Sequence, residues 1–178
     1  RFNFVVEGIR SMPDDPKFWQ HIMKFCKENK IAVYEQDWMR NQMDSFTYLR
    51  AEIGAADRWL TDMANAASEN QVNIQYCMAT PAMWMSSVKY PTVSNVRACG
   101  DYGPRWPHTY DIPYFMQTSM FAWAVGVWPY KDTFQSVQRG RINGERKPEL
   151  MGLVSALSAG PLAPGDEIGW ISKDICMA

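Results

Sequence analysis

The stretch Ile31-Ala-Val-Tyr-Glu-Gln-Asp-Trp38 joins a short apolar run to two acids, an amide and a large aromatic side chain. The run from Ile31 to Tyr34 has the composition of a buried β-strand. Parallel-strand enzymes present catalytic groups at the carboxyl ends of their strands, and Asp37 stands beside Trp38 at such an end. An Asp after a strand also commonly caps the next helix or turn, so the interpretation of Asp37 depends on the rest of the chain.

The composition is that of a globular protein with one domain over residues 1–178. Hydrophobic residues make up 47% of the chain and charged residues 21%, which argues against disorder. A net charge of -1 does not favour nucleic acid or an anionic membrane surface as a partner. The longest apolar run, Met120 to Trp128, is too short to span a bilayer. We therefore expect no membrane span.

The four cysteines are Cys26, Cys77, Cys99 and Cys176. None of them forms a CxxC pair and their spacing matches no zinc pattern, so no metal site is predicted. Buried free thiols are expected, and a Cys77–Cys99 disulfide is the alternative if their strands are neighbours. No cofactor is predicted.

Strand-like and helical segments alternate through the chain at the repeat of βα units. The expected strands lie near 2–7, 31–37, 72–78, 93–99, 123–129 and 161–164. The expected helices lie at 17–30, 44–70, 82–88, 113–120 and 149–158. Asp15 and Pro16 are typical of a helix start, and residues 11–16 are expected to form a turn before it. Residues 139–147 are expected to form a polar surface loop.

Two architectures fit this alternation. A doubly wound sheet is one, but the chain has no glycine-rich phosphate loop of the GxGxxG or Walker type. A (β/α)8 TIM barrel fits better, because polar residues follow so many of the expected strands. The strand over 2–7 would then be buried on both faces of a parallel sheet.

Carboxylates follow several of the expected strands: Glu7, Asp37, Asp101, Asp132 and Asp166. In a barrel these strand ends converge on one face. Glycoside hydrolysis needs two carboxyl groups, one to attack or activate water and one to protonate the leaving oxygen. Ordinary loop salt bridges remain the alternative for these residues.

The sequence motifs at the strand ends, in their order along the chain, resemble those of glycoside hydrolase clan D, which contains the α-galactosidase, melibiase and raffinose-synthase-like enzymes. Tyr34-Glu-Gln-Asp37 resembles the fourth barrel strand, which ends in the nucleophile, and Arg97-Ala-Cys-Gly-Asp101 resembles the Arg-x-x-x-Asp pattern after the sixth. Trp128-Pro-Tyr-Lys-Asp-Thr-Phe-Gln-Ser136 is similar to the Trp-Pro-x-x-Asp-x-Phe-x-Ser segment of plant-type members. Residues 155–161, with Gly165 and Asp166, are similar to the last helix and strand. The resemblance covers nearly the whole chain, from the third strand to the eighth.

The resemblance implies a retaining α-glycosidase that acts on a carbohydrate, with Asp37 as nucleophile and Asp101 as acid/base. It implies a partial barrel, with the missing part upstream of Arg1, and an extracellular or lysosomal location. It also implies sugar contacts from six residues: Glu35, Trp38, Cys77, Arg97, Tyr102 and Asp132. Trp38 and Tyr102 would form apolar walls, and Arg97 would hold a sugar hydroxyl and orient Asp101.

One position departs from the family pattern. Glu35 stands where the family has a lysine that binds sugar hydroxyls, so an ammonium donor is replaced by an acceptor. Two alternatives to hydrolysis therefore stay open: a transglycosylase, and a non-catalytic carbohydrate-binding or structural barrel. Arg97 could be a structural ion-pair partner of Asp101 or Glu7, and Lys131 and Asp132 a surface pair.

Overall fold

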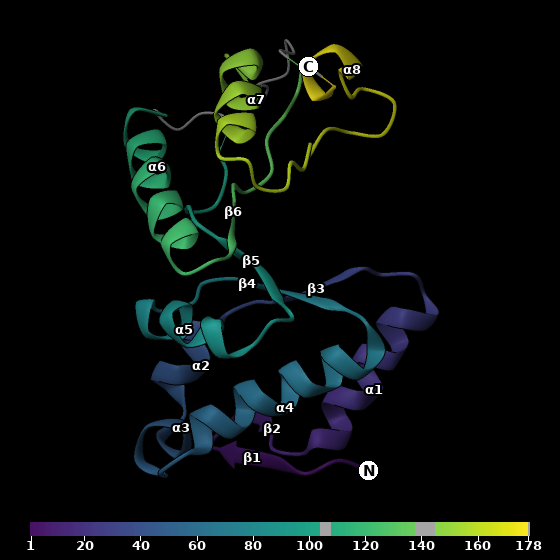
Figure 1. Ribbon diagram of the computed structural model, residues 1–178, viewed down its shortest axis with the longest axis vertical. Coiled ribbons are helices and arrows are strands. Elements are labelled where there is room, and N and C mark those ends of the chain that lie inside the picture. The colour runs from purple at the N-terminus through teal and green to yellow at the C-terminus, as the bar shows by residue number, and fades with distance from the viewer. Residues whose placement is uncertain (104–107, 138–144, 178) are drawn as a thin grey trace. The chain divides into compact units, whose positions relative to one another are not determined.

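The computed structural model describes residues 1–103, 108–137 and 145–177, with only the backbone described for 108–111. The chain divides into two units, Arg1–Ser94 and Asn95–Ala178. Figure 1 labels the helices and strands in chain order.

The first unit begins with an antiparallel hairpin. Strand β1 (Phe4–Glu7) pairs with β2 (Arg10–Pro13), and Gly8 between them has a φ of 64°. Glycine adopts this left-handed conformation without a steric penalty, so a two-residue turn returns the chain at once. The predictions of a doubly buried parallel strand over 2–7 and of a turn over 11–16 are therefore wrong.

Helix α1 (Pro16–Glu28) starts as predicted. The side chain of Asp15 accepts the Lys17 N–H at 2.9 Å, and Pro16 occupies the first helical turn. The helix buries three side chains and packs against α4 (Ala55–Asn70), which lies beside it in Figure 1. The buried residues of α1 are Trp19, Met23 and Cys26.

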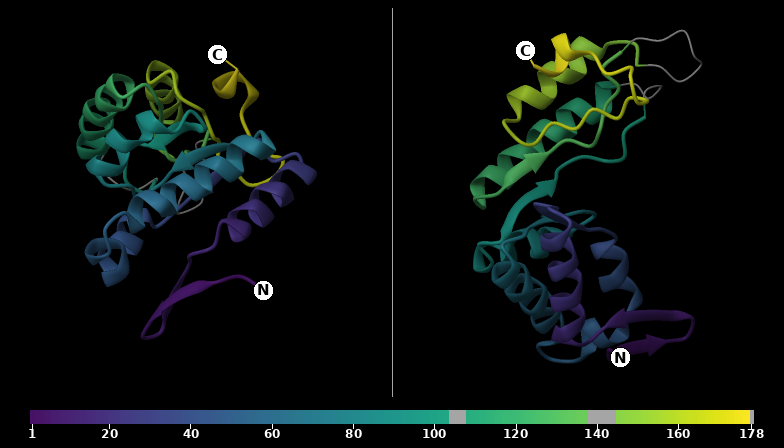
Figure 2. Two further views of the ribbon diagram at one scale, coloured as in Figure 1. Left: turned by 60° about the horizontal axis from the view of Figure 1, so that its bottom comes forward. Right: turned by 90° about the vertical axis from the view of Figure 1, so that its right-hand side faces the viewer.

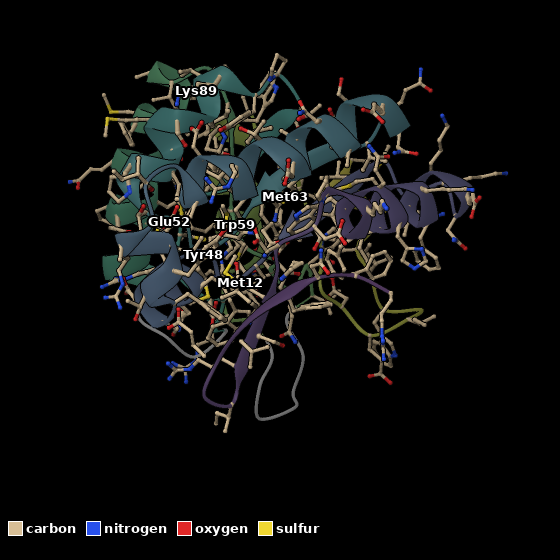
Figure 3. The ribbon with its side chains drawn as sticks, turned by 90° about the horizontal axis from the view of Figure 1, so that it is seen from below. Met12, Tyr48, Glu52, Trp59, Met63 and Lys89 are labelled. Atoms are coloured by element: carbon tan, nitrogen blue, oxygen red, sulfur yellow. The ribbon has the colours of Figure 1, made fainter. Side chains whose placement is uncertain are left out.

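The single helix predicted over 44–70 is three helices, α2 (Met39–Ser45), α3 (Thr47–Ala51) and α4. Phe46 has extended backbone between the first two, and Gly54 has a φ of 80° before the third. An extended residue and a left-handed residue each interrupt the helical hydrogen-bond ladder. Met12 of β2 and Trp59 and Met63 of α4 are buried (Figure 3).

Two parallel strands complete the first unit. Strand β3 (Val33–Gln36) pairs with β4 (Asn73–Tyr76), and the chain passes through α4 between them. Helix α5 (Pro81–Ser86) and a 3₁₀ turn (Ser87–Lys89) then lead to β5 (Val93–Arg97). The strands predicted at 31–37 and 72–78 are thus confirmed, with shorter bounds.

The second unit repeats the βαβ pattern. Strand β5 pairs in parallel with β6 (Trp128–Tyr130), and α6 (His108–Ala124) connects them. Helices α7 (Pro148–Leu157) and α8 (Lys173–Cys176) follow and contact one another (Figure 2). The segment predicted as a strand from 123 is partly the end of α6, and near 161–164 there is only an isolated bridge between Phe134 and Pro164.

The predicted TIM barrel is wrong. The described residues form a mixed α/β fold with one two-stranded antiparallel sheet and one parallel sheet in the order β3-β4-β5-β6. No barrel closure occurs among these six strands. The physical reason lies at the start of the chain, where the backbone groups of β1 pair with β2 and do not extend the parallel sheet.

Two further predictions can be compared with the structure. Within the described ranges, no helix is both long and apolar enough to cross a membrane. The four cysteines are free, with Cys26 and Cys77 buried and Cys99 and Cys176 half-buried. The prediction of thiols outside disulfides is therefore confirmed, their predicted burial holds for Cys26 and Cys77, and the alternative Cys77–Cys99 disulfide is not formed.

Candidate functional site

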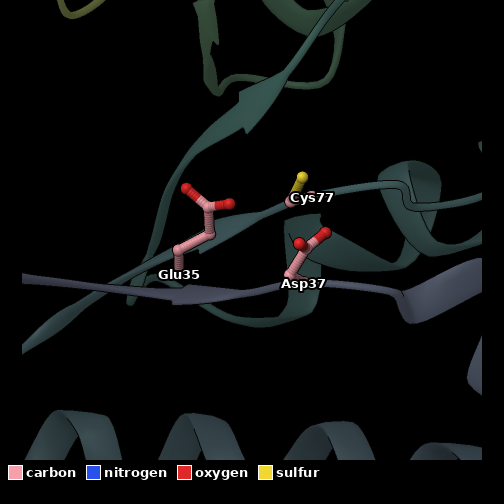
Figure 4. A group of neighbouring side chains, drawn as sticks. All are labelled: Glu35, Asp37 and Cys77. Carbon is pink, nitrogen blue, oxygen red and sulfur yellow. The ribbon is translucent and has the colours of Figure 1, made fainter. Parts of the chain in front are cut away.

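The carboxyl ends of β3 and β4 bring three predicted site residues together. The carboxylates of Glu35 and Asp37 and the thiol of Cys77 have ligand atoms that all lie within 4.8 Å of one another. Alternate residues of a strand share a face, and Glu35 is paired in register with Gln75, two residues before Cys77. Figure 4 shows the three side chains pointing to one side of the two strands.

This first-unit cluster carries negative charge with little compensation. The Gln75 amide donates to Glu35 Oε2 at 2.5 Å, and the Trp38 N–H donates to Asp37 Oδ1 at 2.7 Å. Among the residues that the structure describes, no lysine or arginine forms an ion pair with Glu35 or Asp37. A ligand that approaches these two acids therefore meets acceptors rather than donors.

The backbone after both strands is unusual. Trp38 has a φ of 58° and Met78 a φ of 51°, left-handed values that cost an ordinary residue about 1–2 kcal/mol. The two turns are bonded to each other, because the amides of Met39 and Arg40 donate to the carbonyls of Cys77 and Met78 at 3.4 and 2.8 Å. Such strain commonly accompanies functional sites. The Trp38 side chain is 57% exposed and available to a ligand.

Two carboxylates and a thiol are also a donor set that a divalent cation such as zinc accepts. Catalytic zinc sites use three protein ligands and leave a fourth position open. Sequence spacing gave no sign of this set, since Glu35 and Asp37 come from one strand and Cys77 from its neighbour. Strand register brings the three together.

In the second unit, Arg97 at the end of β5 connects two acids. Its Nη2 lies 2.7 Å from Asp101 Oδ1, and its Nη1 lies 3.9 Å from Asp132 Oδ2. The side chain of Arg97 is 13% exposed and that of Asp101 is 82% exposed. The predicted contact between Arg97 and Asp101 is confirmed. Asp101 thus presents an accessible carboxylate that a largely buried guanidinium holds in place.

Asp132 organises the loop after β6. Its Oδ2 accepts the Tyr102 N–H at 2.6 Å and its Oδ1 accepts the Thr133 N–H at 2.9 Å. The Asp132 N–H donates to Cys99 Sγ at 3.1 Å, and burial raises the pKa of the Cys99 thiol. These bonds tie the strand ends of β5 and β6 together.

Lys131 is not part of a surface pair, so that expectation is wrong. Its side chain is buried, and its ammonium donates to the carbonyls of Asp132 and Thr133 at 3.2 and 3.5 Å. The ammonium also lies 5.0 Å from the centre of the Tyr102 ring, within the range of a cation–π attraction. A small pocket of about 20 Å³, enough for one water molecule, lies among Lys131, Asp132, Asp101 and Tyr102.

The phenol of Tyr102 is engaged inside the protein. It donates to Glu145 Oε2 at 2.5 Å and accepts the Gln135 N–H at 3.3 Å. Burial, followed by the Glu145 hydrogen bond, raises the pKa of Tyr102 far above its ordinary value. Sequence reasoning missed Glu145, because it falls in the predicted polar loop over 139–147, of which 139–144 lie outside the described residues.

Glu7 does not stand at the end of a parallel strand. Its two carboxylate oxygens accept the N–H groups of Thr47 and Tyr48 at 2.9 and 2.8 Å, at the start of α3. These bonds lower the pKa of Glu7, with the Tyr48 amide as the larger cause. Its contacts are those of a structural carboxylate that holds the hairpin to α3.

No protein-family model matches the chain. No curated protein matches it.

Proposed function

We propose that this chain is a carbohydrate-active enzyme that cleaves α-glycosidic bonds with retention of configuration. The motif order described above supports the proposal, as does the position of Asp37 and Asp101, each after a strand of a parallel pair. Ligands of open α/β sheets bind outside the carboxyl ends of the strands, so the proposal does not depend on a closed barrel.

The observation that carries the proposal is the Arg97–Asp101 pair at 2.7 Å, in which the carboxylate faces solvent and the arginine is mostly buried. A general acid/base must reach a substrate oxygen while its orientation stays fixed. In the proposed reaction, Asp101 gives its proton to the leaving oxygen as the glycosidic bond breaks. It later takes a proton from the water that hydrolyses the intermediate.

Asp37 is the proposed nucleophile. Its Oδ1 accepts the Trp38 N–H, and among the described residues no donor to Oδ2 is present. Oδ2 would attack the anomeric carbon and form an ester to the sugar, while the leaving oxygen departs with the proton from Asp101. The exposed indole of Trp38 would cover an apolar sugar face.

Glu35 would then contact a sugar hydroxyl, with the fully buried Cys77 thiol within 4.8 Å of its carboxylate. Because the Gln75 amide fixes Glu35 Oε2 at 2.5 Å, the carboxylate is oriented to accept hydrogen bonds from a ligand. Asp132 would act on the sugar indirectly, by its ion pair with Arg97, because its side chain is only 20% exposed.

A panel of 4-nitrophenyl α-glycosides tests the proposal. We expect release of nitrophenolate from at least one of them, and NMR spectra taken early in the reaction should show the α-anomer of the free sugar first. The Asp37→Asn variant is the matched negative control. Turnover of none of the panel, or first appearance of the β-anomer, would contradict a retaining α-glycosidase.

Glu35 also favours a second candidate, a non-catalytic sugar-binding protein, because the donor of the family pattern is absent. In that case wild type and Asp37→Asn would bind a sugar with the same affinity, and neither would hydrolyse any α-glycoside of the panel. A transglycosylase would use the same two acids and pass the sugar to a second sugar. Added acceptor sugar would then yield an oligosaccharide in place of the free sugar.

A further inference from the structure

Tyr102, the residue next to Asp101, is fixed at both its backbone and its phenol. Its N–H donates to Asp132 Oδ2 at 2.6 Å, and its hydroxyl donates to Glu145 Oε2 at 2.5 Å and accepts from the Gln135 N–H. A hydrogen bond to a charged acceptor is about twice as strong as a neutral one. The loop that carries Asp101 is thus bonded to segments after β6 and before α7.

Glu145 is itself held firmly. The residue is fully buried, and its Oε1 accepts the Lys147 N–H at 2.9 Å. Its own N–H donates to the Gln135 side chain at 3.2 Å. Glu145 therefore provides a fixed acceptor for the Tyr102 hydroxyl, because its carboxylate cannot follow a moving phenol without giving up the Lys147 bond.

The ring of Tyr102 has a third contact. The buried Lys131 ammonium lies 5.0 Å from its centre and is held by the carbonyls of Asp132 and Thr133. A Phe side chain would keep this ring contact and lose only the hydroxyl bonds. Tyr102→Phe is therefore a narrow test of the hydroxyl's bonds to Glu145 and Gln135.

We propose that Tyr102 and Glu145 are positioning residues for Asp101. Arg97 orients the Asp101 carboxylate, while the Tyr102–Glu145 bond fixes the loop from which that carboxylate projects. The inference rests on the proposed function, since it assigns these residues to the acid/base of that reaction. In this inference the Tyr102 phenol stabilises the protein's own loop and does not contact the sugar.

The test uses leaving groups of different basicity. An alkyl leaving group needs proton donation, whereas a 2,4-dinitrophenyl group departs without it, so a displaced acid slows only the first. For Tyr102→Phe we expect kcat/KM on the methyl α-glycoside to fall by about 10- to 100-fold, and on the 2,4-dinitrophenyl α-glycoside by less than about threefold. Tyr114→Phe, at an exposed position of α6, should match wild type on both substrates.

The outcomes separate the inference from the proposed function. If wild type turns over neither substrate, the proposed function fails and the inference fails with it. If wild type is active and Tyr102→Phe loses activity equally on both substrates, or on neither, only the inference is overturned. If Tyr102→Phe does not fold, Glu145→Gln is measured in its place, and the same difference between the two leaving groups is required.

Discussion

The strand ends of the two units hold their acids in different ways. At β3 and β4, Glu35 and Asp37 lie near Cys77, and no arginine or lysine of the described chain pairs with either acid. At β5 and β6, Asp101 and Asp132 share Arg97. Strand register and hydrogen bonds hold the first group without an ion pair among the described residues, whereas ion pairs to Arg97 add to the hydrogen bonds of the second.

This difference agrees with two chemical roles. A nucleophilic carboxylate needs an open path to the anomeric carbon and must keep its negative charge. The first group meets both needs, because no cation pairs with its two acids among the described residues. A general acid/base must be aimed at one oxygen in successive steps, and the bonded second group restricts its motion. Substitutions in each group test whether the two groups differ in this way.

The largest effect is expected in the first group. Asp37→Asn removes the nucleophile and should lower kcat on a responsive 4-nitrophenyl α-glycoside by at least about 10³-fold. The matched control is Asp44→Asn, an exposed acid of the same unit that forms an ion pair with Arg40 and should leave kcat unchanged. Equal activity of Asp37→Asn and Asp44→Asn would remove Asp37 from the mechanism.

In the second group, the acid that ties the loop together should matter for folding. Asp132→Ala leaves the Tyr102 and Thr133 N–H groups without their acceptor and takes a partner from Arg97. We expect the free energy of unfolding in urea to fall by about 2–3 kcal/mol. Glu35→Ala is the comparison, because Gln75 is the one side-chain partner of Glu35 among the described residues. A loss of stability for Asp132→Ala no greater than that for Glu35→Ala would mean that the two groups do not differ.

Backbone strain beside Asp37 gives a smaller effect. Trp38 has a φ of 58°, so Trp38→Gly should be more stable than Trp38→Ala by about 1 kcal/mol, measured by urea unfolding. Both variants lose the indole and should bind sugar equally weakly. A more stable alanine variant would mean that the turn changes conformation when the indole is removed.

The smallest effect concerns the hairpin and the pH dependence of stability. The amides of Tyr48 and Thr47 lower the pKa of Glu7 below its ordinary value of 4.5. A lowered pKa stabilises the fold above the unfolded-state value, and this stability is lost as the pH falls through the folded-state value. Between about pH 6 and pH 3, Glu7→Gln should therefore show a shallower fall of Tm than wild type. Parallel Tm curves would place the acid sensitivity elsewhere, for example at Asp15, whose pKa is also lowered.

Local signals in the sequence predicted several elements correctly. Asp15 and Pro16 start α1, and the apolar runs mark β3 and β4. Each of these depends on residues within one turn or one strand. The errors came where one residue's backbone conformation redirects the chain, as at Gly8 in the hairpin and Gly54 before α4.

The candidate site was predictable only in part. Asp37 and Asp101 follow strands, and Arg97 contacts Asp101 four residues later, as the motif suggested. Glu145 could not be found in this way, since it is bonded to Tyr102, which is 43 residues distant in sequence. Lys131 was expected at the surface because no neighbouring residue in the sequence indicates that its ammonium lies near the rings of Tyr102 and Phe134.

The central claim is that Asp37 forms a covalent bond to the sugar, and mass spectrometry tests it most directly. The protein would be incubated with a fluorinated glycosyl fluoride of the sugar that the turnover panel selects, then digested and sequenced by fragmentation. We expect one added fluorosugar, located on Asp37 and absent from Asp37→Asn. An adduct on Glu35, or no adduct from a reagent that the protein binds, would contradict it.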